Sequence, residues 1–145
     1  MKPKLAQAYM KTAETFAELS HARRLHVGAI VVKDDRIISI GYNGMPAGWP
    51  NDCEDVVQHS DDTTTLKTKP EVLHAETNAI AKLARSSDSG LGADIFITHA
   101  PCLDCAKLIY QCGIRRVWYG AEYRSGDGPE FLRKSGVEVI KFDTK

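Results

Sequence analysis

Hydrophobic residues in the first twenty positions recur at intervals of three and four, which is the spacing of one helix face. The pattern predicts an amphipathic helix that ends near Leu19. Two β-rich runs follow at residues 27–32 and 37–40, and the polar residues 33–36 between them predict a β-hairpin. The residues on the helix face are Leu5, Ala8, Tyr9, Thr12, Ala13 and Phe16.

Residues 41–70 show no sustained hydrophobic period and are rich in Gly, Pro, Asn, Asp and Thr. A loop of this length inside a small domain is usually functional. We therefore expect contacts with a ligand in this segment.

Helical and strand-like segments alternate from Val72 to the end of the chain. A helical period begins at Val72, a strand is predicted at residues 95–97, and Pro101 opens a third helix that Gly113 caps. A strand at 117–119, a helix with Pro129 at its first position and an edge strand at 137–142 complete the pattern. The alternation predicts a single α/β domain with a mixed sheet over residues 1–145.

The composition and net charge of the chain indicate which kind of molecule it binds. The chain has 145 residues, of which 43% are hydrophobic, enough for one core. Lys plus Arg equals Asp plus Glu at 19 each, so no overall basic field can hold a long nucleic acid. A small substrate is favoured. Residues 1–10 lack an apolar signal segment, and no run approaches about 20 apolar residues, which predicts a cytoplasmic protein.

Two short segments carry the candidate chemistry: H-A-E at residues 74–76 and P-C-L-D-C at residues 101–105. In a reducing compartment, Cys102 and Cys105 at CxxC spacing indicate metal or redox chemistry. On one helix face, near its N-terminus, both favour the thiolate form. With the imidazole of His74 they supply three zinc ligands and leave a fourth position for water, as in a catalytic site.

Glu76 lies two residues after His74, where its carboxylate can reach the bound water without binding the metal. Zinc lowers the pKa of water to about 7, which supplies hydroxide at neutral pH. Glu76 is then expected to move protons from the water to a ring nitrogen and to departing ammonia. A CxxC pair alone more often indicates redox chemistry or structural zinc, but neither interpretation uses both His74 and Glu76.

The order H-x-E followed by P-C-x-x-C is similar to the signature of zinc-dependent nucleobase deaminases. The chain resembles the cytidine deaminase-like superfamily, and within it the deoxycytidylate deaminases, over nearly its whole length. The matching segments are V-G-A-I at 27–30, G-Y-N-G-M-P at 41–46, H-A-E-T-N-A-I at 74–80 and P-C-L-D-C-A-K at 101–107. The resemblance implies a three-layer α/β/α fold with a central mixed sheet of about five strands.

The resemblance also implies an activity and a set of substrate contacts. The expected reaction is zinc-dependent hydrolysis of dCMP to dUMP and ammonia, which supplies dUMP for thymidylate synthesis. Asn43 is expected to reach the sugar, and its neighbours Gly41 and Gly44 to let the backbone approach the ligand. Val27, His74 and the backbone at Ala100 would surround the base, and an aromatic side chain would close the pocket. That aromatic is Tyr123, and the candidates for the phosphate are Ser20, Arg23, Arg24 and Arg124.

Regulation is a further implication of the resemblance. Many deoxycytidylate deaminases are hexamers that dCTP activates and dTTP inhibits, with Mg²⁺ on the triphosphate, and the segment linked to that effector site is Tyr42, Asn43 and Gly44. Some relatives hold a second zinc, for which Cys53 and His59 are possible ligands, although a cysteine expected near Ala22 is absent. Cys112 is more simply a small buried hydrophobe.

Three other functions stay open at this point. The same metal chemistry could act on a base in transfer RNA or single-stranded nucleic acid, which needs a positive groove with stacking aromatics. It could act on a free nucleoside or another pyrimidine-like heterocycle. The chain could instead be a zinc-stabilised binding module without catalysis, although such a module has no need of Glu76.

Overall fold

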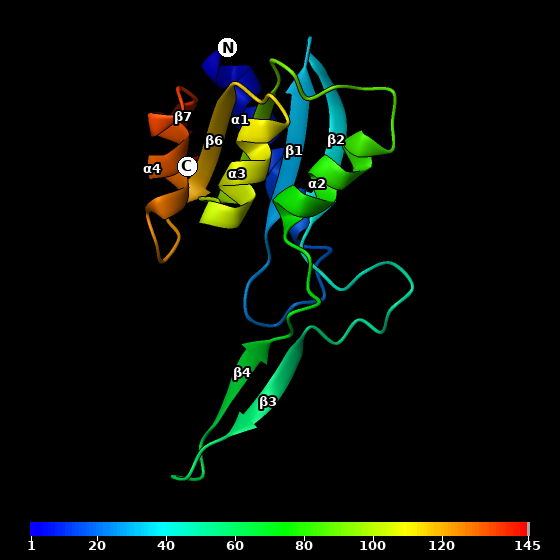
Figure 1. The fold of residues 1–145 in the computed structure, drawn as a ribbon, viewed down its shortest axis with the longest axis vertical. Coiled ribbons are helices and arrows are strands. Elements are labelled where there is room, and N and C mark those ends of the chain that lie inside the picture. Colours follow the sequence, from blue (N-terminus) through cyan, green and yellow to red (C-terminus); the bar gives the residue numbers. More distant parts are fainter. Residues whose placement is uncertain (145) are drawn as a thin grey trace.

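The structure is a computed structural model that describes residues 1–144. Its described part contains a five-stranded central sheet built from β1 (Gly28–Lys33), β2 (Arg36–Tyr42), β5 (Asp94–His99), β6 (Arg116–Ala121) and β7 (Glu138–Lys141), in the order β2-β1-β5-β6-β7 (Figure 1). β1 pairs antiparallel with β2 and β5, whereas β5 with β6 and β6 with β7 pair parallel. The predicted mixed sheet and the hairpin of β1 and β2 are confirmed.

Four helices in the described residues cover the two faces of the sheet. Helix α1 (Pro3–Ala17) packs on one face, and α2 (Ala75–Ala84), α3 (Leu103–Gln111) and α4 (Asp127–Lys134) pack on the other. Alternate residues of β1 serve the two cores: Ile30 and Val32 face α1, while Ala29 and Val31 face the three-helix side. This confirms the three-layer α/β/α fold. No helix within residues 1–144 has the length and apolar character needed to cross a bilayer.

Two glycines allow the helices to lie unusually close to the sheet. A Cβ on Gly28 would lie 2.0 Å from the carbonyl oxygen of Ala13 in α1. A Cβ on Gly41 would lie 2.2 Å from the carbonyl oxygen of Ala75 in α2. The expected role of Gly41 in ligand approach is therefore replaced by a packing role, since the backbone of α2 fills the space that a side chain would need.

The segment predicted as an irregular loop contains a second, two-stranded sheet. β3 (Glu54–Gln58) pairs antiparallel with β4 (Thr64–Thr68), and the hairpin projects away from the main body (Figure 1). Most of its side chains are exposed, so no buried face imposes a hydrophobic period of two. The loop prediction was wrong here because polar residues predominate in these strands and the few apolar ones, Val56, Val57 and Leu66, do not alternate toward a buried core.

Several boundaries differ from the pattern. Helix α2 begins at Ala75, so Val72 precedes it. Helix α3 begins at Leu103 after Pro101, and Pro129 is the third residue of α4, where a helix still lacks an internal partner for the N–H that proline does not have. Gly113 follows the C-cap of α3 with φ of 88°, as expected for a glycine that ends a helix.

Candidate active site

The N-termini of α2 and α3 bring three metal-binding side chains together. His74 is the N-cap residue of α2, Cys102 is the N-cap residue of α3, and Cys105 lies in the first turn of α3. His74 Nδ1 lies 3.3 Å from Cys105 Sγ and 3.5 Å from Cys102 Sγ. All three ligand atoms lie within 4.8 Å of one another, which no other group of three or more His, Cys, Asp or Glu residues achieves among residues 1–144.

The donor set and its spacing fit zinc. In a tetrahedral site with Zn–N of about 2.1 Å and Zn–S of about 2.3 Å, a nitrogen and a sulfur ligand are about 3.6 Å apart. The two observed separations of 3.3 and 3.5 Å are close to this value. One nitrogen and two sulfur donors are typical of zinc, and three protein ligands leave the fourth corner for a small ligand.

The pKa values of the two cysteine thiols are shifted in opposite directions. Hydrogen bonds from the Cys105 thiol and from His74 lower the pKa of Cys102 to about 4. The hydrogen bond to Cys102, followed by burial, raises the pKa of Cys105. The pair therefore holds one thiolate and one thiol, and a metal that binds both sulfurs must displace the proton of Cys105.

Glu76 lies in the first turn of α2, two residues from His74, and its side chain is buried at 4% exposure. Burial raises the pKa of its carboxyl group to about 7, and the charge of His74 opposes this rise. A carboxyl group with a pKa near neutrality can both accept and donate a proton at physiological pH. This is the property that a proton carrier beside a metal-bound water needs.

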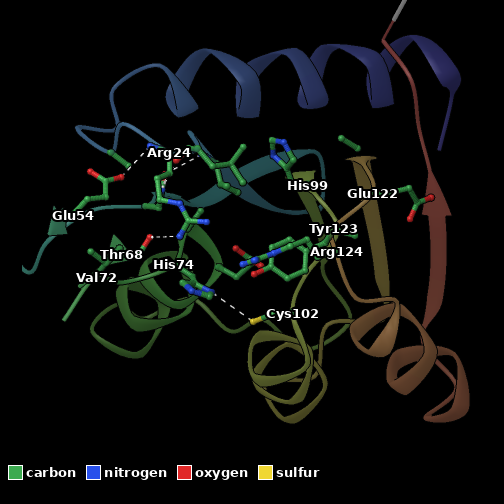
Figure 2. A pocket seen from close by; sticks show the side chains of 18 residues that line it. Arg24, Glu54, Thr68, Val72, His74, His99, Cys102, Glu122, Tyr123 and Arg124 are labelled. Carbon is green, nitrogen blue, oxygen red and sulfur yellow. Dashed lines mark hydrogen bonds between the residues drawn. The ribbon is translucent and has the colours of Figure 1, made fainter. Parts of the chain in front are cut away.

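A cavity of about 470 Å³ opens in front of these residues. Figure 2 shows that side chains from separate segments converge on it, with Arg24 on one side and Tyr123 and Arg124 on another. The volume is within the usual range for small-molecule sites. The lining comprises Ala22, Arg24, Leu25, Val27, Asn43, Glu54, Thr68, Val72, His74, Ala75, Glu76, His99, Ala100, Cys102, Ala121, Glu122, Tyr123 and Arg124.

Asn43 holds one wall of this cavity in place. Its Oδ1 accepts a hydrogen bond of 2.8 Å from the backbone N–H of Val27, and its Nδ2 donates one of 2.8 Å to the carbonyl oxygen of Leu25. The adjacent Tyr42 carbonyl accepts from the side chain of Asn78 in α2 at 2.8 Å. The segment after β2 is thus tied both to the loop before β1 and to the helix that carries Glu76.

Comparison with known protein families bears on this arrangement. The model of the family described as "Cytidine and deoxycytidylate deaminase zinc-binding region" matches residues 3–121. The chain belongs to this family. Its membership places the chain among zinc-dependent deaminases, and the matched range includes His74, Cys102 and Cys105.

Individual family members resemble the chain over nearly its full length. The deoxycytidylate deaminase of Enterobacteria phage T4 is 31% identical over 97% of this chain and 91% of the relative, and that of Homo sapiens is 35% identical over 94% and 79%. A crystal structure of the dCMP deaminase from cyanophage S-TIM5 in complex with dCMP and dUMP has 48% identity and a TM-score of 0.87, and covers 98% of this chain and 99% of that one.

Within this deaminase, two of the residues suggested for the phosphate lie outside the cavity lining. Ser20 is buried below α1, where its Oγ accepts from the backbone N–H of Ala22 at 3.2 Å. The guanidinium of Arg23 lies 3.7 Å from Asp52 and 3.6 Å from Glu54. Since its charge already has acidic neighbours, Arg23 is the weaker candidate, and Arg24 and Arg124 are the arginines that line the cavity.

The residues considered for a second zinc are not brought together. Cys53 is buried at the base of the β3–β4 hairpin, with its Sγ 3.6 Å from the carbonyl oxygen of Asn51. His59 follows β3, and its Nε2 lies 2.8 Å from Thr65 Oγ1. Six residues along an extended strand separate them by about 20 Å. Cys112, at the C-cap of α3, packs half-buried against the core, as expected.

Nine residues of the cavity lining were not predicted as site residues from the sequence: Ala22, Leu25, Glu54, Thr68, Val72, Ala75, His99, Ala121 and Glu122. Glu54 and Thr68 face each other across the β3–β4 hairpin, which the sequence pattern did not reveal. His99 is the last residue of β5, and burial lowers the pKa of its imidazole. Only its position two residues before the P-C-L-D-C segment could have suggested that it lies beside the site.

Proposed function

We propose that this deaminase hydrolyses the exocyclic amine of deoxycytidine monophosphate to give deoxyuridine monophosphate and ammonia. One observation carries the proposal: a single cavity is lined by the zinc ligands His74 and Cys102, by the buried carboxyl of Glu76 and by two arginines able to bind a phosphate. The similarity to a dCMP deaminase structure with bound dCMP and dUMP supports the same substrate.

The catalytic roles follow from the positions of these side chains. His74, Cys102 and Cys105 would hold zinc, which when bound supplies an activated water for attack on the amine-bearing carbon. Glu76 would accept one proton of that water and deliver it to the ring nitrogen. It would then take the second proton, from the hydroxyl group added to the carbon, and pass it to the amino group, which leaves as ammonia as the carbon–nitrogen bond breaks. Its burial and its pKa of about 7 suit each of these transfers at neutral pH.

The substrate contacts are assigned by position in the cavity. Val27, Ala100 and Tyr123 line the part of the cavity assigned to the base, and Asn43 is assigned to the sugar. Arg24 is assigned to the phosphate because it lines the cavity and forms no ion pair with a carboxylate among the described residues. A planar guanidinium is well suited to two phosphate oxygens.

Regulation by nucleotides is proposed mainly on the family resemblance. In this proposal dCTP activates and dTTP inhibits the enzyme, with Mg²⁺ on the triphosphate, and Tyr42, Asn43 and Gly44 transmit the effect within a homo-oligomer, a hexamer being favoured. The link of Asn43 to the loop before β1 supports the idea, because a ligand that displaced this segment would also move the cavity wall.

Steady-state ammonia release by the zinc-loaded protein tests the proposal. We expect turnover of dCMP that exceeds turnover of deoxycytidine, because only dCMP carries the phosphate for Arg24. Equal turnover of both substrates would assign the enzyme to nucleosides. Turnover of an oligonucleotide in preference to dCMP would move it to the nucleic-acid deaminases. Adding dCTP or dTTP to the same assay tests the regulation.

A further inference from the structure

Glu54 is a buried acidic residue that lines the cavity but has no role in the proposed chemistry. Its side chain is 1% exposed, although it belongs to the first residue of a hairpin whose other side chains are mostly solvated. Removing a carboxylate from water is costly unless hydrogen bonds or charges compensate for the loss of solvation. The contacts of Glu54 therefore indicate what the charge does.

Glu54 binds the backbone of the loop that precedes β1. Its Oε2 accepts hydrogen bonds from the backbone N–H of Arg23 at 2.9 Å and of Arg24 at 3.0 Å. Its Oε1 accepts no hydrogen bond from the described residues and has only the guanidinium of Arg23 nearby, at 3.6 Å. One carboxylate oxygen thus fixes two consecutive peptide units, and the second of these carries the side chain assigned to the phosphate.

The same hairpin holds the other end of Arg24. Thr68, the last residue of β4, pairs directly with Glu54 across the two strands. Its Oγ1 accepts a hydrogen bond of 3.2 Å from Nη1 of Arg24. In Figure 2 a dashed line joins the Arg24 guanidinium to Thr68, and Glu54 lies to the left of the Arg24 backbone, to which another dashed line joins it.

We propose that the base of the β3–β4 hairpin is the positioning element of the phosphate site, with Glu54 orienting the backbone of Arg24 and Thr68 orienting its guanidinium. This inference rests on the proposed function, since it assumes a phosphorylated substrate. Glu54 itself is a positioning residue, because it acts on the substrate through Arg24. An arginine held at both ends loses less side-chain freedom when the phosphate binds, which strengthens binding.

The test compares a phosphorylated with an unphosphorylated ligand in the zinc-loaded protein. We expect Glu54→Ala and Thr68→Val to raise KM for dCMP, and Kd for dUMP, by about tenfold or more, the effect of losing one good charge-assisted contact. kcat, zinc content and the affinity for deoxyuridine should stay within about twofold of wild type. Asp55→Asn is the matched control, since it removes an exposed carboxylate from the next residue of the same strand.

A double variant distinguishes positioning from general destabilisation. If Glu54 acts through Arg24, Glu54→Ala should add less than about twofold to the effect of Arg24→Ala, because neighbouring groups in one network are not additive. Additive effects, an equal loss with deoxyuridine, or an unchanged KM for dCMP would overturn the inference. Should Glu54→Ala fail to fold, Thr68→Val alone carries the test. If the wild-type protein binds zinc but does not turn over dCMP, the proposed function itself is refuted.

Discussion

Glu76 is the residue to which the proposed chemistry assigns the proton transfers. We expect Glu76→Gln to lower kcat for dCMP by about a hundredfold or more, because an amide of the same shape cannot accept and return a proton. The substitution leaves all three metal ligands in place, so zinc stoichiometry measured by atomic absorption should not change. Ammonia release within about tenfold of the wild-type rate would remove Glu76 from its assigned role.

Cys105 is the most deeply buried of the three proposed metal ligands, at 2% exposure. Cys105→Ser should release most of the zinc during dialysis, because a hydroxyl is a far poorer zinc ligand than a thiolate. Metal content per protein chain measures the effect. Cys112→Ser is the control, since Cys112 is half-buried but lies outside the site, and this variant should keep its zinc.

The sequence was sufficient to predict the three side chains that the structure brings together as a candidate metal site, because His and Cys are distinctive metal-binding residues and the two cysteines have a fixed spacing. His74 and Cys102 are moreover N-cap residues, so the helix starts that the pattern predicted also orient them. Glu54 could not be predicted in this way. Its contacts are with backbone N–H groups 30 and 31 residues away, and a backbone group carries no sequence signature.

At the scale of elements, α4 supports the segment that carries Cys102. A Cβ on Gly128, in the first turn of α4, would lie 1.9 Å from the carbonyl oxygen of Pro101. We expect Gly128→Ala to lower the free energy of unfolding by about 1–3 kcal/mol and to weaken zinc binding, since the added methyl must displace the start of α3. Chemical denaturation and competition with a chelator measure the two effects.

Gly126 supplies the comparison for this substitution. It is the N-cap residue of the same helix, and a Cβ there would meet nothing within 4 Å. Gly126→Ala should therefore leave zinc affinity unchanged. A similar loss of affinity in both variants would show that α4 responds to any glycine replacement rather than to the close contact with Pro101.

The sequence pattern predicted the buried strands but not the exposed strands β3 and β4. β1, β5 and β6 have continuous buried runs, and their existence followed directly from the sequence. β3 and β4 expose most of their residues, so neither alternation nor a hydrophobic run marked them. The hairpin is held by backbone pairing and by contacts at its base, and neither of these leaves a periodic trace in the side chains.

For the whole molecule, zinc bound at the proposed site would join α2, which precedes the central strand β5, to α3, which follows it. Removing the zinc with a chelator should lower Tm by about 10 °C, because metal at a thousandfold excess over Kd stabilises a fold by about 4 kcal/mol. Differential scanning calorimetry measures the change. Zn²⁺ should restore the transition and Mg²⁺ should not, since thiolates are poor ligands for Mg²⁺.

The difference in Tm between the zinc-loaded and the zinc-free protein should decrease as the pH falls. Binding zinc displaces the proton of Cys105, whose pKa is raised, whereas Cys102 with a pKa of about 4 is already a thiolate at neutral pH. Lowering the pH from 8 to 6 should therefore weaken zinc binding and shrink the difference in Tm between the loaded and stripped proteins. A difference that grows on acidification would contradict this assignment.

The three proposed metal ligands all fall between residues 74 and 105, a span that contains α2, β5 and the first turn of α3. Closing a chain segment of about 30 residues costs little more conformational entropy than closing one of half that length, about 0.6 kcal/mol. A nascent chain that has left the ribosome as far as α3 thus already contains all three protein donors of the proposed site. Metal capture does not have to wait for β6, α4 and β7, and it can order the segment that those later elements pack against.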